Sequence, residues 1–240
     1  MSESLDRPID VPQLTAEEIL ARVLHRDGLM LVIDKPAGLP VHRGPKGGPN
    51  LEASFDALRF GLPRPPALAH RLDKDTSGCL VLGRHRKATA SLGLLFKHGK
   101  ISKTYWAIVE GGPAADEGTI DIPLGRLNAE RGWWQKVDPE GQQAITNWKV
   151  MGRGDGLTWL ALEPVTGRTH QLRVHSSAQG WPIFGDNIYG NGPRFGEPRL
   201  HLHSREIGIP ISKNKEPVRV VAPAPEHMRE RLRACGWNGQ

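Results

Sequence analysis

Apolar residues occur along this chain in short runs that are separated by glycine, proline and charged residues. The compact runs at residues 29–33, 78–82 and 105–109 predict strands, because each is short and is bounded by polar or turn-forming residues. Turn residues also separate several later runs, which is typical of strands that pair antiparallel with their neighbours. These further strands are predicted at residues 120–122, 135–137, 144–150, 157–162, 200–209 and 218–221.

Helical spacing of apolar residues is found in fewer segments. Residues 87–98 have an amphipathic pattern that ends at Gly99, and Thr15 and Glu18 have the spacing of a capping box. The capping box predicts a short helix with an apolar face made by Ile19, Leu20 and Val23. The remaining helices are predicted at residues 51–60, 169–179 and 225–234. Helices interleaved with many short strands predict an α+β fold with a mixed, mainly antiparallel β-sheet and flanking helices.

The composition of the 240-residue chain excludes several classes of protein. No run of about 20 apolar residues exists, so a membrane span is not expected. The first ten residues are polar and do not match a secretion signal, and the two cysteines, Cys79 and Cys235, fit a reducing cytoplasm. No HExxH, CxxC, GxGxxG or P-loop motif is present, so neither a metal ion nor a nucleotide cofactor is expected.

The charge is basic, with a formal net charge of +6. This balance fits a polyanionic partner such as nucleic acid, and it fits solubility equally well. Its distribution is more informative, because residues 84–103 hold six Lys or Arg, two His and no Asp or Glu. Such a segment is typical of an edge that faces phosphates, although a solvated helix face has the same composition.

Two polar blocks stand at element boundaries, where a rigid strand or helix can present a site. Residues 70–78 lead from a proline-rich break into a strand, and residues 167–175 lead from a glycine turn into a helix. The second block carries two Arg and two His in the first turns of the helix, where the macrodipole disfavours positive charge unless an anion is close. Read alone, the first block also fits a charged turn and the second a charged helix surface.

Together, four blocks in this order and spacing resemble the RluA-type RNA pseudouridine synthases over about residues 25–222. The blocks are Asp34-Lys35-Pro36-Ala37-Gly38, His70-Arg71-Leu72-Asp73 with Thr76-Ser77-Gly78, Lys103-Thr104-Tyr105, and Gly167-Arg168-Thr169-His170-Gln171-Leu172-Arg173-Val174-His175 followed by Gly185-Asp186. The resemblance implies a mainly antiparallel sheet with a central catalytic cleft. It also implies isomerisation of uridine to pseudouridine in ribosomal or transfer RNA, without a cofactor.

The resemblance also implies roles for individual residues. The family's catalytic aspartate falls on Asp73, its base-stacking tyrosine on Tyr105 and the basic partner of the aspartate on Arg173. Arg71 corresponds to the arginine that displaces the target base. The other expected substrate contacts are His70, Thr76, Lys103, Arg168 and His170.

The expected organisation is a lead-in at residues 1–24 and one catalytic domain at residues 25–240, acting as a monomer. The N-terminal S4 RNA-binding module of many family members does not fit within the lead-in, so substrate selection is expected to rest on the catalytic domain. Trp133-Trp134-Gln135-Lys136 is a candidate for an extra RNA contact, and two strand aromatics explain it equally well.

Two other functions remain open from the residues. One is an RNA chaperone that keeps the fold without the reaction, although RNA binding alone does not require a carboxylate that faces a polyanion. The other is a hydrolase that uses Asp73 and Asp75 as paired carboxylates on a glycosidic bond. Hydrolysis would release free base, whereas isomerisation releases none.

Overall fold

The computed structural model describes residues 11–44, 47–128, 134–212 and 214–239. These residues form two compact units. The chain passes from one to the other within strands β5 (Ser102–Glu110) and β11 (Leu202–Ile209), and again between Pro223 and Ala224. We call residues 11–103 and 204–223 the Asp73 unit, and residues 104–203 and 224–239 the Arg173 unit. The expected division into residues 1–24 and 25–240 stays a prediction.

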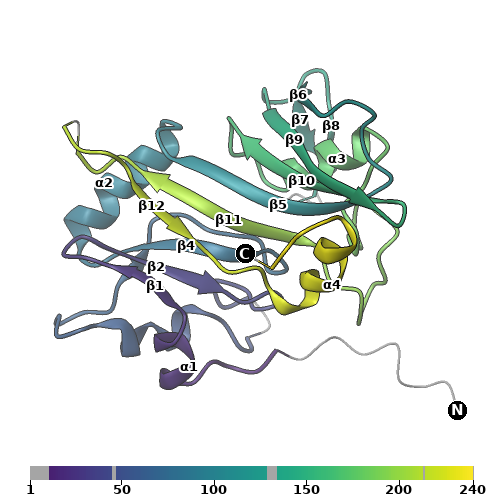
Figure 1. Cartoon of the computed structure of the whole chain (residues 1–240). Coiled ribbons are helices and arrows are strands. Elements are labelled where there is room, and N and C mark those ends of the chain that lie inside the picture. The colour runs from purple at the N-terminus through teal and green to yellow at the C-terminus, as the bar shows by residue number, and fades with distance from the viewer. Residues whose placement is uncertain (1–10, 45–46, 129–133, 213, 240) are drawn as a thin grey trace, which may run out of the picture. The chain divides into compact units, whose positions relative to one another are not determined.

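The Asp73 unit is built on strands in the order β1-β2-β4-β11, with β3 paired to β4 and β12 paired to β11 (Figure 1). Residues of β2, β4, β11 and β12 form its buried core, and Leu92 and Ile101 pack against them. The bounds of its strands are Val23–Arg26 (β1), Met30–Lys35 (β2), Ala67–Leu68 (β3), Ser77–Gly83 (β4) and Val218–Val221 (β12). Its helices are α1 (Ala16–Leu20), the 3-10 helix η1 (Glu52–Leu58) and α2 (Arg86–Lys97).

The Arg173 unit has the strand order β5-β10-β9-β6 and a separate pair, β7-β8. Strands β9 (Ile145–Gly154) and β10 (Leu157–Pro164) are joined by Asp155 and Gly156, which have φ values of 54° and 72° and so fit a two-residue hairpin turn. The remaining elements are β6 (Glu117–Asp121), β7 (Leu124–Arg126), β8 (Gln135–Val137), α3 (Gln171–Ala178) and α4 (Glu226–Ala234).

Both faces of the Arg173 unit's larger sheet are covered, because the side chains of β5 and β10 alternate between them. On one face, Ala107 and Leu160 pack against Leu172 of α3 and Trp181. On the other, Trp106 and Trp159 pack against α4. None of the described helices is long and apolar enough to cross a membrane.

The structure confirms the predicted α+β class, and every strand pair with a described register is antiparallel. The capping box is also confirmed, since Thr15 and Glu18 each bond the other's backbone amide. The helix expected at residues 51–60 is present as the 3-10 helix η1, and the Asn50 side chain accepts from the Ala53 amide at 3.1 Å where it begins. One expectation was wrong, because Val23 belongs to β1 instead of the first helix.

Strand β9 carries a glycine where helix α4 ends against it. A Cβ built on Gly152 would lie 1.8 Å from the Cys235 carbonyl oxygen, which is backbone and cannot move aside cheaply. We expect Gly152→Ala to lower the free energy of unfolding by about 1–3 kcal/mol, the usual cost of overpacking. Thermal unfolding measures this, and Gly28→Ala is the control because nothing lies within 4 Å of its Cβ position. Equal melting temperatures for the two variants would contradict the close approach.

Candidate active site

Asp73 lies in a turn between β3 and β4 that backbone hydrogen bonds fix in place. The Thr76 amide donates to the Asp73 carbonyl at 3.2 Å, and the Gly38 amide donates to the Lys74 carbonyl at 2.9 Å. Thr76 is buried, Asp73 is half-buried and Arg71 is exposed. The turn therefore presents Asp73 and Arg71 toward solvent while its far side is anchored. The expected contact of the buried Thr76 with substrate stays a prediction.

The anchor is the side chain of Lys35, which is 0% exposed at the end of β2. Its Nζ donates to the carbonyl oxygens of Pro36 at 2.8 Å, Lys74 at 2.8 Å and Thr76 at 2.9 Å. Three acceptors match the three N–H donors of an ammonium group. Lys35 therefore ties the loop after β2 to the turn that carries Asp73.

Burial and nearby charges shift the pKa values of Lys35 and Asp34 in opposite directions. Burial lowers the pKa of Lys35 to about 7, while the carboxylates of Asp75, Asp73 and Asp34 act in the opposite direction. Burial also raises the pKa of Asp34 to about 6, against the charges of Arg22 and Lys35. The Asp73 turn thus sits in a field of one buried amine and three carboxyl groups.

His70 supports the same turn from the protein side. Its Nε2 accepts from the Val81 amide at 3.0 Å, and its ring stacks on Phe96 of α2 with the centroids 4.0 Å apart. Burial lowers the pKa of His70 to about 3, and the positive charge of Lys103 acts in the same direction. The ring is therefore neutral at physiological pH and braces the start of the turn. A direct substrate contact by His70 or by Lys103 stays a prediction.

In the Arg173 unit, Arg173 of α3 makes a bidentate ion pair with Asp186. Nε donates to Oδ2 at 2.8 Å and Nη2 donates to Oδ1 at 2.7 Å, and both side chains are almost fully buried. Burial alone would raise the pKa of Asp186, but the hydrogen bonds and charge of Arg173, with the amides of Tyr189 and Ile188, hold it below its ordinary value. Asp186 therefore fixes the orientation of the guanidinium.

The start of α3 is shaped by a saturated polar network. The Gln171 side chain accepts from the Arg168 amide at 3.0 Å and from the Thr166 hydroxyl at 2.7 Å, and it donates to the Ile145 carbonyl at 2.9 Å. Arg168 itself is exposed and donates from Nε to the Gln143 carbonyl at 3.0 Å. This leaves the outer edge of the Arg168 guanidinium at the surface, where the expected phosphate contact stays a prediction.

His170 precedes α3 with a φ of 52°, a left-handed conformation that is uncommon for a residue with a side chain. Its Nδ1 lies 2.7 Å from the Tyr189 hydroxyl, and that hydroxyl accepts from the Gln135 amide at 2.9 Å. Only 8% of His170 is exposed. The strained residue is thus held by Tyr189, whose ring also lies 5.3 Å from the Arg173 guanidinium carbon.

Tyr105 lies near the start of β5, half-buried, on the sheet face that packs against α3. Its strand partner on β10 is Leu162. The Arg173 unit therefore brings Tyr105 and α3 to one face, whereas Asp73, His70 and Lys103 belong to the Asp73 unit. That the two groups form one site stays a prediction.

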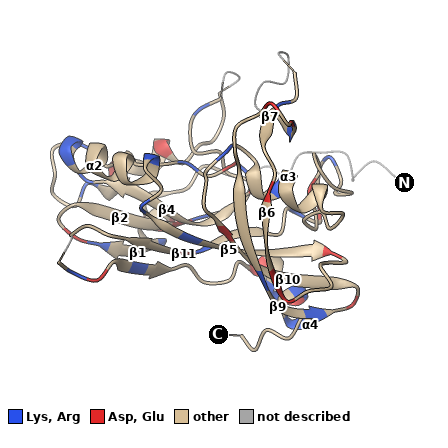
Figure 2. Ribbon diagram, turned by 90° about the horizontal axis from the view of Figure 1, so that it is seen from above, with Lys and Arg blue, Asp and Glu red and all other residues tan. Residues whose placement is uncertain are grey.

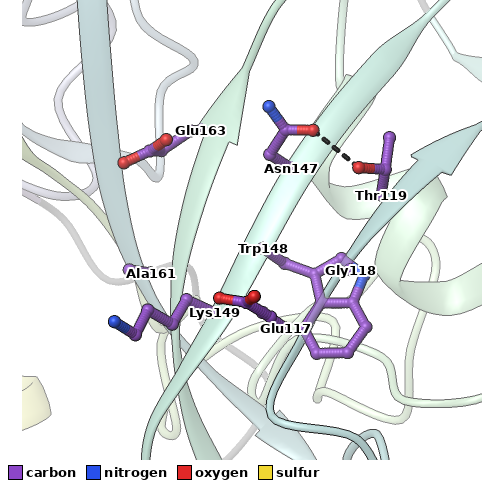
Figure 3. A pocket seen from close by; sticks show the side chains of 8 residues that line it. All are labelled: Glu117, Gly118, Thr119, Asn147, Trp148, Lys149, Ala161 and Glu163. Carbon is purple, nitrogen blue, oxygen red and sulfur yellow. Dashed lines mark hydrogen bonds between the residues drawn. The ribbon is translucent and has the colours of Figure 1, made fainter.

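The opposite face of the Arg173 unit's sheet holds a cavity of about 310 Å³ (Figure 3). Asn147 and Lys149 of β9 line it, and the Thr119 hydroxyl donates to the Asn147 side chain at 2.8 Å. Two carboxylates, Glu117 and Glu163, also line this cavity, which disfavours phosphate there.

Sequence reasoning missed Lys35, Asp186 and Tyr189. Lys35 and Asp186 stand within the quoted motifs, but nothing in the local pattern shows that they are buried. Of the proposed extra contact, Trp133 lies outside the described residues, and Gln135 and Lys136 belong to β8. The described residues contain no cluster of three or more His, Cys, Asp or Glu that could hold a metal ion.

Comparisons with known proteins point to one family. A family model described as RNA pseudouridylate synthase matches residues 29–178, which contain the four motif blocks up to His175. An uncharacterized RNA pseudouridine synthase of Zymomonas mobilis is 43% identical over 207 residues, covering 85% of this chain and 94% of the relative. A mitochondrial pseudouridylate synthase of Xenopus tropicalis is 30% identical and covers 90% of this chain and 81% of the relative.

A solved structure from the same family has a similar fold. That of human RNA pseudouridylate synthase domain containing 4 has a TM-score of 0.76 at 29% identity, covering 91% of this chain and 95% of that one.

Removal of the Lys35 amine tests its role as the anchor. In Lys35→Met three carbonyl oxygens lose a donor, and each buried unpaired group costs about 1–3 kcal/mol. We expect a loss of about 3 kcal/mol, which lowers the melting temperature by about 6–12 °C for a chain of this size. Lys215→Met, at an exposed lysine, is the control and should melt like the wild type.

The difference in the free energy of unfolding between the wild type and Lys35→Met should depend on pH, which gives a second readout. The pKa of Lys35 is about 7 in the folded protein, below its ordinary value of 10.5, so the unfolded chain binds more protons between these values. The Lys35 contribution to the free energy of unfolding therefore rises with pH across this window, and it is lost as pH falls through 7. The gap between the wild type and Lys35→Met should widen from about pH 7 to pH 10. A gap that stays constant or narrows would show that the amine stays charged over this range.

Proposed function

The chain belongs to the RluA-type RNA pseudouridine synthases, and we propose that it converts specific uridines of ribosomal or transfer RNA to pseudouridine with Asp73 as the nucleophile. The observation that carries the assignment of Asp73 is its turn, to which the buried Lys35 amine donates two of its three hydrogen bonds. A nucleophile must keep its position while the detached base turns beside it, and a turn anchored in this way does so.

The reaction conserves every atom of uridine, so it requires no oxidant and no group donor. The bond between N1 of uracil and the anomeric carbon breaks, the base turns, and carbon 5 bonds to the anomeric carbon. Carbon 5 then loses its proton, and N1 ends with one. The Asp73 carboxylate holds the sugar or the base during the rotation as a covalent adduct, which then breaks and restores the carboxylate.

Arg173 keeps Asp73 ionised in this proposal. A site stripped of water raises the pKa of a carboxyl group, whereas a guanidinium about 4 Å away lowers it. At an effective dielectric constant near 20 such a contact is worth about 4 kcal/mol before desolvation. The bidentate pair with Asp186 supports this role, because it fixes the direction of the guanidinium.

The target uridine must leave its stack, which costs a few kcal/mol. Arg71, exposed beside Asp73, fills the gap in the RNA, and the extruded base stacks on Tyr105, which returns about 1–3 kcal/mol. Lys103, Thr76, Arg168 and His170 complete the substrate contacts in this proposal. We also place the enzyme in the cytoplasm as a monomer, and its two free buried cysteines, Cys79 and Cys235, fit a reducing compartment.

Replacement of Asp73 tests the nucleophile. Asp73→Asn keeps the shape and removes the charge, so we expect no detectable release of tritium from RNA labelled at carbon 5 of uridine. RNA affinity should be retained or increased, since a negative charge near phosphate is gone. Asp75→Asn is the matched control in the same turn and should keep turnover. If both substitutions abolish the reaction and the wild type releases free uracil, the enzyme is instead a hydrolase with paired carboxylates.

Replacement of Tyr105 separates stacking from packing. Leu keeps the apolar bulk and loses the π-face, so the Tyr105→Leu protein should fold. It should bind the base more weakly by about 1–3 kcal/mol and should lose most of its turnover. Tyr105→Phe keeps stacking and removes the hydroxyl. Its failure to complete the reaction, with a trapped adduct, would assign proton removal at carbon 5 to that hydroxyl. Near-wild-type turnover in a folded Tyr105→Leu protein would refute the stacking role; thermal unfolding verifies folding.

A further inference from the structure

The Asp73 unit contains a cavity of about 520 Å³ that none of the motif residues lines. It lies where the end of β4 meets the first turns of α2 and the segment before β3. Its volume is within the range of about 300–1,000 Å³ that is usual for pockets of small organic ligands. Its lining residues are Leu62, Pro63, Arg64, Pro65, Ala67, Gly83, Arg84, His85, Arg86, Thr89 and Ala90.

Two kinds of side chain line this cavity, which we call the α2 pocket. Leucine, proline and alanine side chains form an apolar floor, and Arg64, His85 and Arg86 are exposed around it. No Asp or Glu lines the pocket, and the first turn of α2 carries no acidic residue. The pocket therefore offers an apolar surface beside an unopposed positive rim.

The arginines of the rim differ in what they contact. Arg84 is committed to the fold, since it donates to the Asp27 carbonyl at 2.7 Å and the Phe60 carbonyl at 3.4 Å and so shapes the wall. The side chains of Arg64 and Arg86 make no hydrogen bond or ion pair with any residue that the structure describes. These two guanidinium groups are available to an anion.

Strand β4 connects the Asp73 turn to the α2 pocket. Strand β4 begins beside the turn at Ser77 and ends at the pocket at Gly83. Six residue steps at about 3.3 Å each put the two ends about 20 Å apart. Helix α2 covers the same span from Arg86 to Phe96, which stacks on His70 at the turn.

Positive charge continues along α2 (Figure 2). Lys87 and Lys97 are exposed on it, Lys100 follows it, and residues 84–103 contain no acidic side chain. A polyanion that reaches the Asp73 turn therefore meets positive charge along the way to the α2 pocket. The cavity in Figure 3 lacks this match, because Glu117 and Glu163 line it.

We propose that the α2 pocket binds one nucleotide of the RNA strand that flanks the target uridine. The base lies on the apolar floor, and the neighbouring phosphates pair with Arg64 and Arg86. This inference rests on the proposed function for the identity of the polyanion as RNA. It goes beyond that function by assigning RNA recognition to residues outside the four motifs.

The first test measures the positive rim. A labelled, unstructured RNA of about 12 nucleotides is titrated with the wild type, Arg64→Ala, Arg86→Ala and the double variant at several salt concentrations. Each substitution should weaken binding about tenfold and reduce the slope of log K against log salt by about 0.7. Lys149→Ala, at an exposed lysine of the acidic cavity, is the control and should change neither value. Unchanged affinity and slope in the double variant would overturn the proposal and leave another polyanion, such as an acidic protein segment, as the partner of this surface.

The second test separates a bound base from charge alone. Ala90→Leu adds bulk to the α2 pocket at an exposed helix position without a change of charge, and leucine is a good helix former. We expect RNA affinity to fall about fivefold or more with the salt slope unchanged. Wild-type affinity in Ala90→Leu would show that phosphates alone are bound, which contradicts occupancy of the pocket by a base. Thermal unfolding confirms that each variant folds.

The outcomes distinguish this proposal from the proposed function. Tritium release by the wild type and its loss in Asp73→Asn test the reaction and do not depend on the α2 pocket. Retained turnover with unchanged RNA affinity in the pocket variants would reject the proposed nucleotide site and leave the proposed reaction unaffected. Weakened binding in the pocket variants, together with an active Asp73→Asn protein, would keep the pocket and remove the nucleophile.

Discussion

The buried amine of Lys35 is the constraint on which the Asp73 turn depends. A charged group without water or a partner is costly in a protein interior, by several kcal/mol even after relaxation. Three carbonyl acceptors and three nearby carboxyl groups offset part of this cost for Lys35, whose pKa burial still lowers to about 7. Two of the acceptors belong to Lys74 and Thr76, so a rearrangement of the turn would strand the amine. The position of Asp73 is thereby tied to the stability of the unit.

The same arrangement creates an electrostatic difficulty for an enzyme that acts on RNA. Asp34, Asp73 and Asp75 gather negative charge around the place that a phosphate chain must approach. Burial raises the pKa of Asp34 to about 6, so this carboxyl group still carries most of its negative charge at pH 7. The positive residues from Arg84 to Lys103 lie on the chain directly after β4 and add to the attraction that Arg71 and Lys74 of the turn supply.

Short-range patterns predicted most of the secondary structure, and long-range contacts decided the rest. The capping box of Thr15 and Glu18 needs only residues three apart, and it formed as expected. Val23 fitted the helical spacing, but it lies in β1 and pairs with Ile33 of β2, a contact that no local pattern contains. Likewise, a lysine at the end of a strand usually lies at the surface, and only the fold brings the carbonyls of Lys74 and Thr76 to Lys35.

The site shows the same division between motif and fold. The motifs nominated Asp73, Tyr105 and Arg173 as site residues, which stays a prediction, whereas the pairing of Arg173 with Asp186 follows from a loop that folds back 13 residues later. This pair changes the electrostatic role expected of Arg173. Asp186 neutralises much of its charge, so its effect on a second carboxylate is smaller than that of a lone arginine, while the five N–H donors of the fork still allow a directed bond. For the proposed role of keeping Asp73 ionised, the direction of this fork therefore matters as much as its charge.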